Sequence, residues 1–308
     1  MLAAYITHQD CVKHEMGSDH PECPERIGAI HDLLLVKGML DYMDCQQAPL
    51  ATEQQLGRAH SLLYVHELAA LSPQSGHIHI DPDTLMNPHT YTAALRAAGA
   101  AVLATDMVLG GKAPVAFCNV RPPGHHAERA AAGGFCFFNN AVVGMRHALD
   151  EHGLERVALV DFDVHHGNGS EDILFDDPRV LMCSTFEKGI YPFCGSNPRG
   201  PNMINVGLPS RSGRDAFRAA VETHWLPALE AFKPQMVFIS AGFDGHRDDY
   251  MGNIGLLEAD YAWVTQQIVQ VAQRHAKGRI VSCLEGGYEL SPLARSVLAH
   301  IRVLTGVD

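Results

Sequence analysis

Short apolar runs alternate with longer amphipathic stretches along much of the chain. The apolar runs have the length and composition of buried strands, at residues 115–120, 157–160, 180–185, 236–240 and 280–284. The amphipathic stretches repeat their apolar positions with helical spacing, at residues 25–39, 92–109, 141–151, 215–232, 258–276 and 291–304. This alternation predicts an α/β fold in which helices flank a doubly wound, mostly parallel sheet. No linker-like tract, charge block or repeat divides the chain, so we expect residues 1–308 to form a single domain.

Four of the predicted strands run directly into polar or glycine-rich turns. These turns lie at residues 121–126, 161–169, 241–246 and 285–288. In an open parallel sheet the carboxyl ends of the strands lie along one edge, where ligands bind. We therefore expect the four turns to converge in space and to form a ligand site.

The turn after the second of these strands carries a candidate metal site. Asp161, Asp163 and His165 are spaced two apart, so their side chains share one face at the end of an apolar strand. Asp163, His165 and Asp244 would together give two carboxylates and one imidazole, which leaves a coordination position open for water and substrate, as in catalytic zinc sites. A simpler interpretation is that these residues only cap the following helices, but it explains one acidic residue and not the whole set.

Two adjacent histidines and a tyrosine are candidates for proton chemistry. His125 and His126 follow a rigid Arg-Pro-Pro-Gly turn, and we expect Asp161 and Asn168 to hold their other ring nitrogens. Because a carboxylate raises the pKa of a histidine more than a neutral amide does, His125 should be mainly protonated and His126 the better general base. A lone histidine pair would be better explained as a hydrogen-bonded core pair, but not beside a metal set. Tyr288 follows two glycines that let the backbone approach a ligand, and its hydroxyl could donate to an oxyanion.

Composition and charge narrow the class of protein. The chain has 308 residues, 46% of them hydrophobic, with 23 Lys and Arg against 35 Asp and Glu, a formal net charge of −12. This excess of acidic groups argues against nucleic acid and against anionic membranes. The most apolar stretch, residues 93–109, contains Arg96 and Asp106, so we expect no membrane span. The first seven residues lack the basic flank of a signal peptide, and the 8 cysteines contain no C-x-x-C pair. We therefore expect a cytoplasmic protein with free thiols.

Seven motifs occur in an order that is similar to one known family. They are His20-Pro-Glu-Cys-Pro-Glu-Arg26, Asp81-Pro-Asp-Thr84, Arg121-Pro-Pro-Gly-His-His126, Gly133-Gly-Phe-Cys-Phe-Phe-Asn-Asn140, Asp161-Phe-Asp-Val-His-His-Gly-Asn-Gly169, Ser240-Ala-Gly-Phe-Asp-Gly-His246 and Glu285-Gly-Gly-Tyr288. The chain resembles the zinc-dependent histone deacetylases of the arginase/deacetylase fold. It is most similar to class II-like members, which include bacterial acetyl-lysine and acetylpolyamine amidohydrolases. Asn168, where class I members have Asp, favours this side of the family.

The resemblance implies a role for each matched residue. One zinc ion per chain would be bound by Asp163, His165 and Asp244. The catalytic set would be His125 and His126 as general acid and base, oriented by Asp161 and Asn168, with Tyr288 polarising the carbonyl. The substrate would contact Phe135, Gly134, Tyr191, Met251, Gly286 and the rim acid Asp83, or less readily Asp81. Arg26 would line an acetate exit route. Potassium would bind beside the zinc through Asp161, Asp163, His165, Ser184 and Thr185, and a second potassium site would use Leu174 and Val180.

Two departures from the family pattern bear on the substrate. The family's Asp-Pro-Leu-Gly segment reads Asp249-Tyr-Met-Gly252 here, so Met251 stands where polyamine-selective relatives carry a glutamate, and Tyr250 replaces a proline. An apolar gate offers no salt bridge to a second ammonium group. We therefore expect a deacetylase of acyl-lysine or similar N-acetylated amines. The alternatives are an acetylpolyamine or other small-amide deacetylase, an arginase-like dinuclear enzyme and a non-catalytic acetyl-lysine binding protein. The chain could also be a homo-oligomer.

Overall fold

A single eight-stranded sheet organises the protein, and all of its strands run parallel. The computed structural model describes residues 1–307. The strands lie in the order β2-β1-β5-β10-β9-β6-β7-β8. They are β1 (Ala3–Thr7), β2 (Met43–Gln47), β5 (Val115–Cys118), β6 (Val157–Asp161), β7 (Val180–Glu187), β8 (Met203–Leu208), β9 (Met236–Ala241) and β10 (Ile280–Leu284). A short antiparallel pair, β3 (Ile78–His79) and β4 (Leu85–Met86), lies apart from it.

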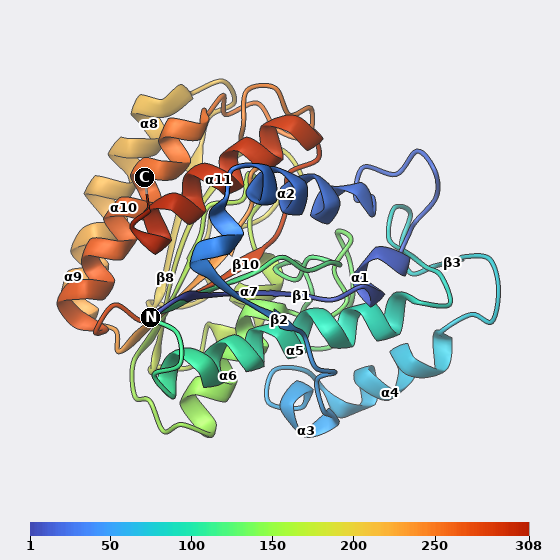
Figure 1. The fold of residues 1–308 in the computed structure, drawn as a ribbon. Coiled ribbons are helices and arrows are strands. Elements are labelled where there is room, and N and C mark those ends of the chain that lie inside the picture. The colour runs from blue at the N-terminus through green and yellow to red at the C-terminus, as the bar shows by residue number, and fades with distance from the viewer. Residues whose placement is uncertain (308) are drawn as a thin grey trace.

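Helices cover both faces of the sheet, as Figure 1 shows. On one side lie α2 (Glu25–Val36), α10 (Glu258–His275) and α11 (Leu290–Thr305), and on the other α5 (Thr90–Leu109) and α6 (Asn140–Asp150). The remaining helical elements are α1 (Asp10–Lys13), η1 (Met39–Tyr42), α3 (Glu53–Leu56), α4 (Leu62–Leu71), α7 (Asn168–Leu174), α8 (Gly213–Ala220), η2 (Val221–Trp225) and α9 (Leu226–Phe232). This arrangement confirms the predicted doubly wound α/β fold, in which each sheet face is buried beneath helices.

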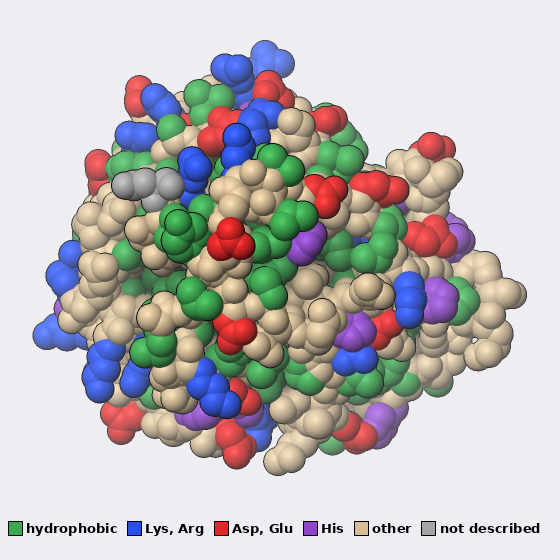
Figure 2. Space-filling model, viewed as in Figure 1, with side chains coloured by type: hydrophobic (Ala, Val, Ile, Leu, Met, Phe, Trp, Pro, Cys, Tyr) green, Lys and Arg blue, Asp and Glu red, His purple; other side chains and the backbone are tan. Residues whose placement is uncertain are grey.

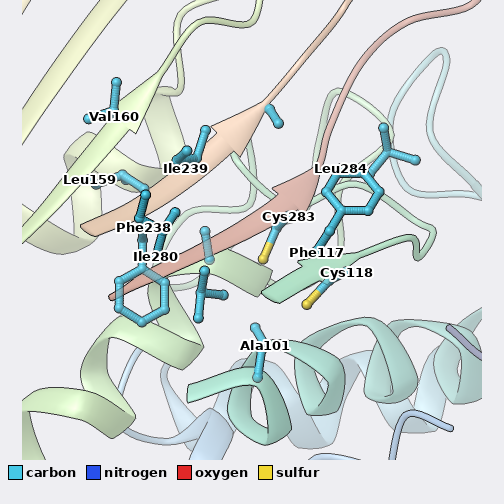
Figure 3. Close-up of a cluster of buried hydrophobic side chains, with 14 of the residues drawn as sticks. Ala101, Phe117, Cys118, Leu159, Val160, Phe238, Ile239, Ile280, Cys283 and Leu284 are labelled. Atoms are coloured by element: carbon cyan, nitrogen blue, oxygen red, sulfur yellow. The ribbon is translucent and has the colours of Figure 1, made fainter. Parts of the chain in front are cut away.

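The core extends over both faces of the sheet, and one part of it lies between the four central strands and α5. Figure 3 shows Phe117, Leu159, Phe238 and Cys283, one from each central strand, together with Ala101 of α5. All five side chains are buried. Because both faces of these strands are covered, their sequences are almost continuously apolar instead of alternating. The apolar strands therefore end abruptly where the polar turns begin.

Helix α5 has the length and composition of a membrane span but is part of this core. Two thirds of its most apolar window is buried inside the protein. It packs on β1, β5, β10 and α6. Where α5 crosses α6, Gly144 allows the close approach, since a Cβ there would lie 3.0 Å from the Cβ of Ala101. The apolar residues of α5 are thus explained by contact with the sheet.

The predicted elements are all present, and the structure adds others. The stretch predicted as one helix over 215–232 consists of α8 and α9 joined by a π-helical turn, η2. Strands β1, β2 and β8 were not predicted, and neither were the short helices α1, α3, α4 and α7. β2 and β8 are edge strands with polar or half-buried residues, so they lack the apolar run that marks a central strand.

On the face shown in Figure 2, basic and acidic side chains are interspersed.

Candidate active site

The predicted metal ligands lie together at the carboxyl ends of β6 and β9. One ligand atom from each of Asp163, His165 and Asp244 lies within 4.8 Å of the others, and all three residues are buried. Nδ1 of His165 is 3.1 Å from a carboxylate oxygen of Asp163 and 3.1 Å from one of Asp244. Backbone N–H groups of Val164 and His165 donate to the same two carboxylates at 2.9 Å. These bonds leave little freedom for the ligand side chains to rotate.

The charge of this group fits a bound cation. Burial raises the pKa of Asp244 to about 7, because charging a carboxylate away from water is unfavourable. Burial lowers the pKa of His165, but its bonds to Asp163 and Asp244 outweigh that effect and raise it to about 10. Two buried carboxylates beside one imidazole thus attract positive charge to a single point, and oxygen and nitrogen ligands of this kind suit zinc.

Glycines let the chain after β9 and the chain after β10 pack closely against the metal ligands. A Cβ on Gly242 would collide with the carboxylate of Asp163, and one on Gly286 would collide with that of Asp244. In place of a side chain, Gly286 brings its backbone N–H to Oδ2 of Asp163 at 2.8 Å. The glycines are thus required for close approach, and Gly286, which was matched to a substrate contact, supports a candidate metal ligand but does not line the pocket.

The two adjacent histidines take the partners expected of them. Nδ1 of His125 is 3.0 Å from Oδ2 of Asp161, and Nδ1 of His126 is 2.7 Å from Oδ1 of Asn168. Burial lowers the pKa of His125, but the charges of Asp163 and Asp161 outweigh it and raise the pKa to about 10. Burial, together with the charge of His125, holds the pKa of His126 well below its usual range. One ring is therefore charged and the other neutral, the division needed for a general acid and a general base.

A pocket of about 310 Å³ opens onto these groups. It is lined by Asp83, His126, Gly134, Phe135, His165, Tyr191, Met251 and Tyr288. The rings of Phe135 and Tyr288 pack edge to face with their centres 5.9 Å apart. The rings of Tyr191 and His126 pack in the same way with their centres 4.9 Å apart. Burial holds the pKa of Tyr288 well above its usual range, so its hydroxyl keeps its proton and remains a donor. The pocket is a slot with aromatic walls and titratable groups at its base.

Asp81 and Asp83 lie near the rim of the pocket and differ in whether their carboxyl oxygens are free to contact a substrate. Both oxygens of Asp81 are used within its own turn, where Oδ1 accepts the N–H groups of Asp83 and Thr84 at 3.0 and 2.6 Å. Asp83 is exposed and lines the pocket. Burial and the neighbouring Asp81 raise the pKa of Asp83. Asp83 is therefore the carboxyl group available to a substrate.

Arg26 lies directly behind Tyr288. Its guanidinium group sits 4.9 Å from the centre of the Tyr288 ring and donates to the carbonyl of Gly287 at 2.7 Å. It also donates to the carbonyl of Glu285 and pairs with Glu22 at 3.0 Å. The residue is fully buried, so it is not a surface charge at a helix start.

Two supporting carboxylates were not predicted from the sequence. Oε2 of Glu285 accepts the N–H groups of Gly124 and His125 at 2.6 and 3.0 Å and so anchors the histidine turn. Oε1 of Glu128 accepts an N–H of the Asn168 amide at 2.8 Å. The available signal for Glu285 was an acidic residue that ends a buried strand, as Asp161 does. Nothing in the local pattern marks Glu128.

The residues matched to the two potassium sites differ in their burial and in their hydrogen-bond partners. Ser184 lies opposite Asp161 in the pairing of β6 with β7, and both are fully buried. Thr185 follows on the same strand. The carbonyls of Leu174 and Val180, in contrast, accept N–H donors from the side chain of Asn202 at 3.1 and 3.2 Å. The carbonyls of Leu174, Asp177 and Val180 thus converge on one amide, and the second potassium site stays a prediction.

A second cluster of metal-binding residue types lies elsewhere, between the ends of α5 and α6. Nε2 atoms of His147 and His152 lie 2.8 and 2.7 Å from Oδ1 of Asp106. The guanidinium group of Arg58 is 2.7 Å from Nδ1 of His147, and since a guanidinium can only donate, that nitrogen accepts. Nε2 of His147 then carries the ring proton and donates to Asp106. In the structure this cluster is held together by hydrogen bonds among its own members and Arg58.

The fold and the site together define a metal-dependent hydrolase of amide bonds. The model of the histone deacetylase domain matches residues 20–304. The "Histone deacetylase-like amidohydrolase" of Pseudomonas aeruginosa is 36% identical, over 96% of this chain and 80% of that protein. The "Polyamine deacetylase HDAC10" of Mus musculus is 37% identical, over 99% of this chain and 48% of that protein. The crystal structure of the HDA15 HD domain superposes with a TM-score of 0.92 and 32% identity, covering 99% of this chain and 88% of that one.

The chain therefore belongs to the histone deacetylase family. Members are generally metal-dependent, and this chain has the buried ligand group that such an activity needs. It is a hydrolase that acts on amides and deacetylates acetylated amines.

Proposed function

We propose that this protein is a zinc-dependent deacetylase that removes the acetyl group from lysine side chains of peptides or proteins. The observation that carries the proposal is the pocket itself. Its base joins His165 of the candidate metal group, the neutral His126 and the protonated Tyr288, and its walls are aromatic. A slot of this shape suits an apolar methylene chain that ends in an amide.

The side chains at the base of the pocket supply the proton transfers. When bound by Asp163, His165 and Asp244, zinc supplies the Lewis acidity that activates a water molecule and polarises the amide carbonyl. His126 accepts the proton of the attacking water at Nε2, since Nδ1 is occupied by Asn168.

Two further groups complete the reaction. Tyr288 donates its hydroxyl to the carbonyl oxygen as negative charge develops there. The protonated His125 lies beside His126, with ring centres 3.9 Å apart, and can return a proton to the amine that leaves. The products are then acetate and a free lysine amine. Arg26, buried behind Tyr288, supports an exit route for the acetate anion.

The entrance favours acyl-lysine over polyamines. Met251 lines the pocket and offers no charge to a second ammonium group of the substrate. Asp83 at the rim can accept N–H groups of a peptide backbone. The name of the mouse relative keeps acetylpolyamines as the second candidate.

A substrate panel tests the proposal. Acetyl-lysine peptides, longer acyl-lysine peptides, acetylspermidine and acetylputrescine would be compared at a fixed zinc concentration. We expect the highest kcat/KM for an acyl-lysine peptide. A clear preference for an acetylpolyamine would overturn the assignment of acyl-lysine as the substrate. Failure of the zinc-loaded protein to cleave any acetylated amine would indicate a binding protein without catalytic activity.

Three further properties complete the proposal. We expect one zinc per chain, measured by elemental analysis, and one potassium ion held at Asp161, Ser184 and Thr185. All eight cysteines are free, which supports a reducing, cytoplasmic setting. We expect residues 1–308 to act as one catalytic domain on a lysine-containing partner and to bind neither nucleic acid nor membranes.

A further inference from the structure

We propose that Glu128 is a positioning residue that fixes the side-chain amide of Asn168 and, through it, the position of the ring proton of His126. The inference rests on the proposed function, because it concerns the residue to which we assign the role of general base. It adds a third member to the contact between His126 and Asn168.

The three side chains form a chain of two hydrogen bonds. Oδ1 of Asn168 is 2.7 Å from Nδ1 of His126, and Nδ2 of Asn168 donates to Oε1 of Glu128 at 2.8 Å. A carboxylate such as Glu128 can only accept hydrogen bonds. It therefore selects the orientation of the amide in which the NH₂ group faces Glu128 and the oxygen faces the histidine.

The orientation of the amide decides which nitrogen of the ring can act as a base. With Oδ1 facing it, Nδ1 of His126 must carry the proton, which leaves the lone pair of Nε2 toward the pocket. In the flipped orientation the NH₂ of Asn168 would face Nδ1, which would have to accept. The proton of the neutral ring would then lie on Nε2, where it would block proton uptake from water.

The backbone holds Glu128 in place for this contact. Its N–H donates to the carbonyl of Ala131 at 2.9 Å, and its carbonyl accepts from Nδ1 of His60 at 2.9 Å. His60 in turn accepts the N–H of Asn139 at Nε2 and is neutral, since burial lowers its pKa to about 4. The Glu128 side chain is itself only partly buried. Its replacement therefore removes an acceptor without leaving a cavity in the core.

The other histidine needs no such residue. His125 faces the carboxylate of Asp161, whose two oxygens are both acceptors, so the partner has no wrong orientation. We therefore expect the loss of Glu128 to lower kcat only while residue 168 is an amide.

The first experiment is a set of variants measured at saturating zinc. We expect Glu128→Ala to lower kcat about tenfold and to leave KM and the zinc content unchanged. This loss is smaller than the one expected on removal of the general base itself. Glu128→Gln, which can still present an oxygen to Asn168, should recover most of the activity. In the Asn168→Asp background, Glu128→Ala should not lower kcat, because residue 168 can no longer flip and the change removes a carboxylate that would otherwise face the new one at 2.8 Å.

Asp172→Ala is the matched control. Its carboxylate, on α7, accepts the N–H of Arg129 at 3.0 Å and pairs with Arg199 at 2.5 Å, so the substitution removes one nearby negative charge without a contact to the Asn168 amide. We expect it to leave kcat within about twofold. An unchanged kcat in Glu128→Ala, or an equal loss in the Asn168→Asp background, would overturn the proposal.

The second experiment does not depend on activity. In ¹⁵N-histidine-labelled, metal-free protein at neutral pH, the signals of His126 are assigned by their loss in His126→Gln. We expect the proton on Nδ1 in the wild type and a shift toward Nε2 in Glu128→Ala. A proton on Nε2 in the wild type would overturn the inference and the assignment of Nε2 as the base, but not the deacetylase activity itself. A wild type that cleaves no amide, with the proton on Nδ1, would overturn the proposed activity and leave the role of Glu128 in orienting the amide intact.

Discussion

Oδ2 of Asp249 accepts the backbone N–H of Tyr288 at 2.6 Å. Its other oxygen accepts the N–H of Met251 at 3.0 Å, so one buried carboxylate ties the pocket's gate to the end of β10. The side chains of Met251 and Tyr288 belong to one small apolar cluster with Phe135. Asp249 thus holds the backbones of Met251 and Tyr288, two residues that line the slot, in place relative to each other.

Tyr288→Phe should lower kcat about 10²-fold and change KM less than about threefold. The hydroxyl is expected to bond the carbonyl oxygen more strongly in the transition state than in the bound substrate, so its loss affects the chemical step. Steady-state kinetics with an acetyl-lysine peptide measures this. Tyr250→Phe, an exposed tyrosine in the neighbouring loop, is the control. A rise in KM alone would contradict the role of the Tyr288 hydroxyl.

His126→Ala should lower turnover about 10²-fold or more while the metal stays bound. Nε2 of His126 is the proposed proton acceptor, and the ring is neutral because its pKa is held well below the usual range. Elemental analysis of the purified variant separates loss of the base from loss of the metal. The exposed His89→Ala serves as control. A variant with wild-type turnover would remove His126 from the base role.

Asp244→Asn should weaken zinc binding by at least the ~10–100-fold that loss of a supporting contact alone costs. The substitution removes one of two buried negative charges while it preserves the size of the side chain. Equilibrium dialysis gives the affinity, and Asp248→Asn, an exposed acid on the same loop, gives the comparison. Equal affinities in the two variants would show that the metal binds elsewhere.

Met251→Glu should shift the ratio of kcat/KM toward acetylspermidine by about tenfold relative to an acetyl-lysine peptide. A carboxylate at the pocket wall would pair with the second ammonium group of a polyamine, and a partly buried pair is worth more than an exposed one. Met251→Gln is the control, because it introduces a polar side chain of similar size without a charge. If both variants shift the ratio equally, charge at the gate does not select the substrate.

His300 should make the protein less stable as the pH falls. It is fully buried between Thr265 and Ser282, at 2.6 and 2.9 Å, and burial lowers its pKa to about 3. The unfolded chain takes up a proton near pH 6.5, whereas the folded protein does not do so until about pH 3. Stability is therefore complete above pH 6.5 and is lost as the pH falls from there toward 3.

The difference in unfolding free energy between wild type and His300→Gln isolates this effect. It should decrease by about 1.4 kcal/mol per pH unit between pH 6 and 4. Urea titrations at several pH values measure it. A difference that is independent of pH would show that His300 is protonated in the folded state.

The central strands could be predicted from sequence because burial on both faces leaves a continuous apolar run that ends in a polar turn. β10, for example, was placed at residues 280–284 and lies there. β1 is almost as buried, but its five residues, Ala3–Thr7, include two alanines, which do not indicate a strand by themselves. β2 is polar because it lies at the edge of the sheet. Its pairing with β1 is a long-range contact that no local pattern encodes.

The site was predictable where its residues end strands, since strand ends of a parallel sheet meet at one edge. Asp163, His165 and Asp244 are of this kind. Glu128 and Asp249 lie in loops and act through hydrogen bonds to residues far along the chain, 40 and 39 positions away. Such contacts depend on the packed arrangement of loops, so the sequence alone gave no means of finding them.

The strand order has a consequence for the assembly of the protein. β10 is the last strand in the sequence, yet it lies between β5 and β9 near the middle of the sheet. Until it inserts, the two halves of the sheet share no hydrogen-bonded edge, Gly286 does not reach Asp163, and Tyr288 is absent from the pocket. Because the backbone N–H of Gly286 supports the candidate ligand Asp163, a nascent or refolding chain in which β10 has not yet inserted should bind zinc more weakly than the completed fold.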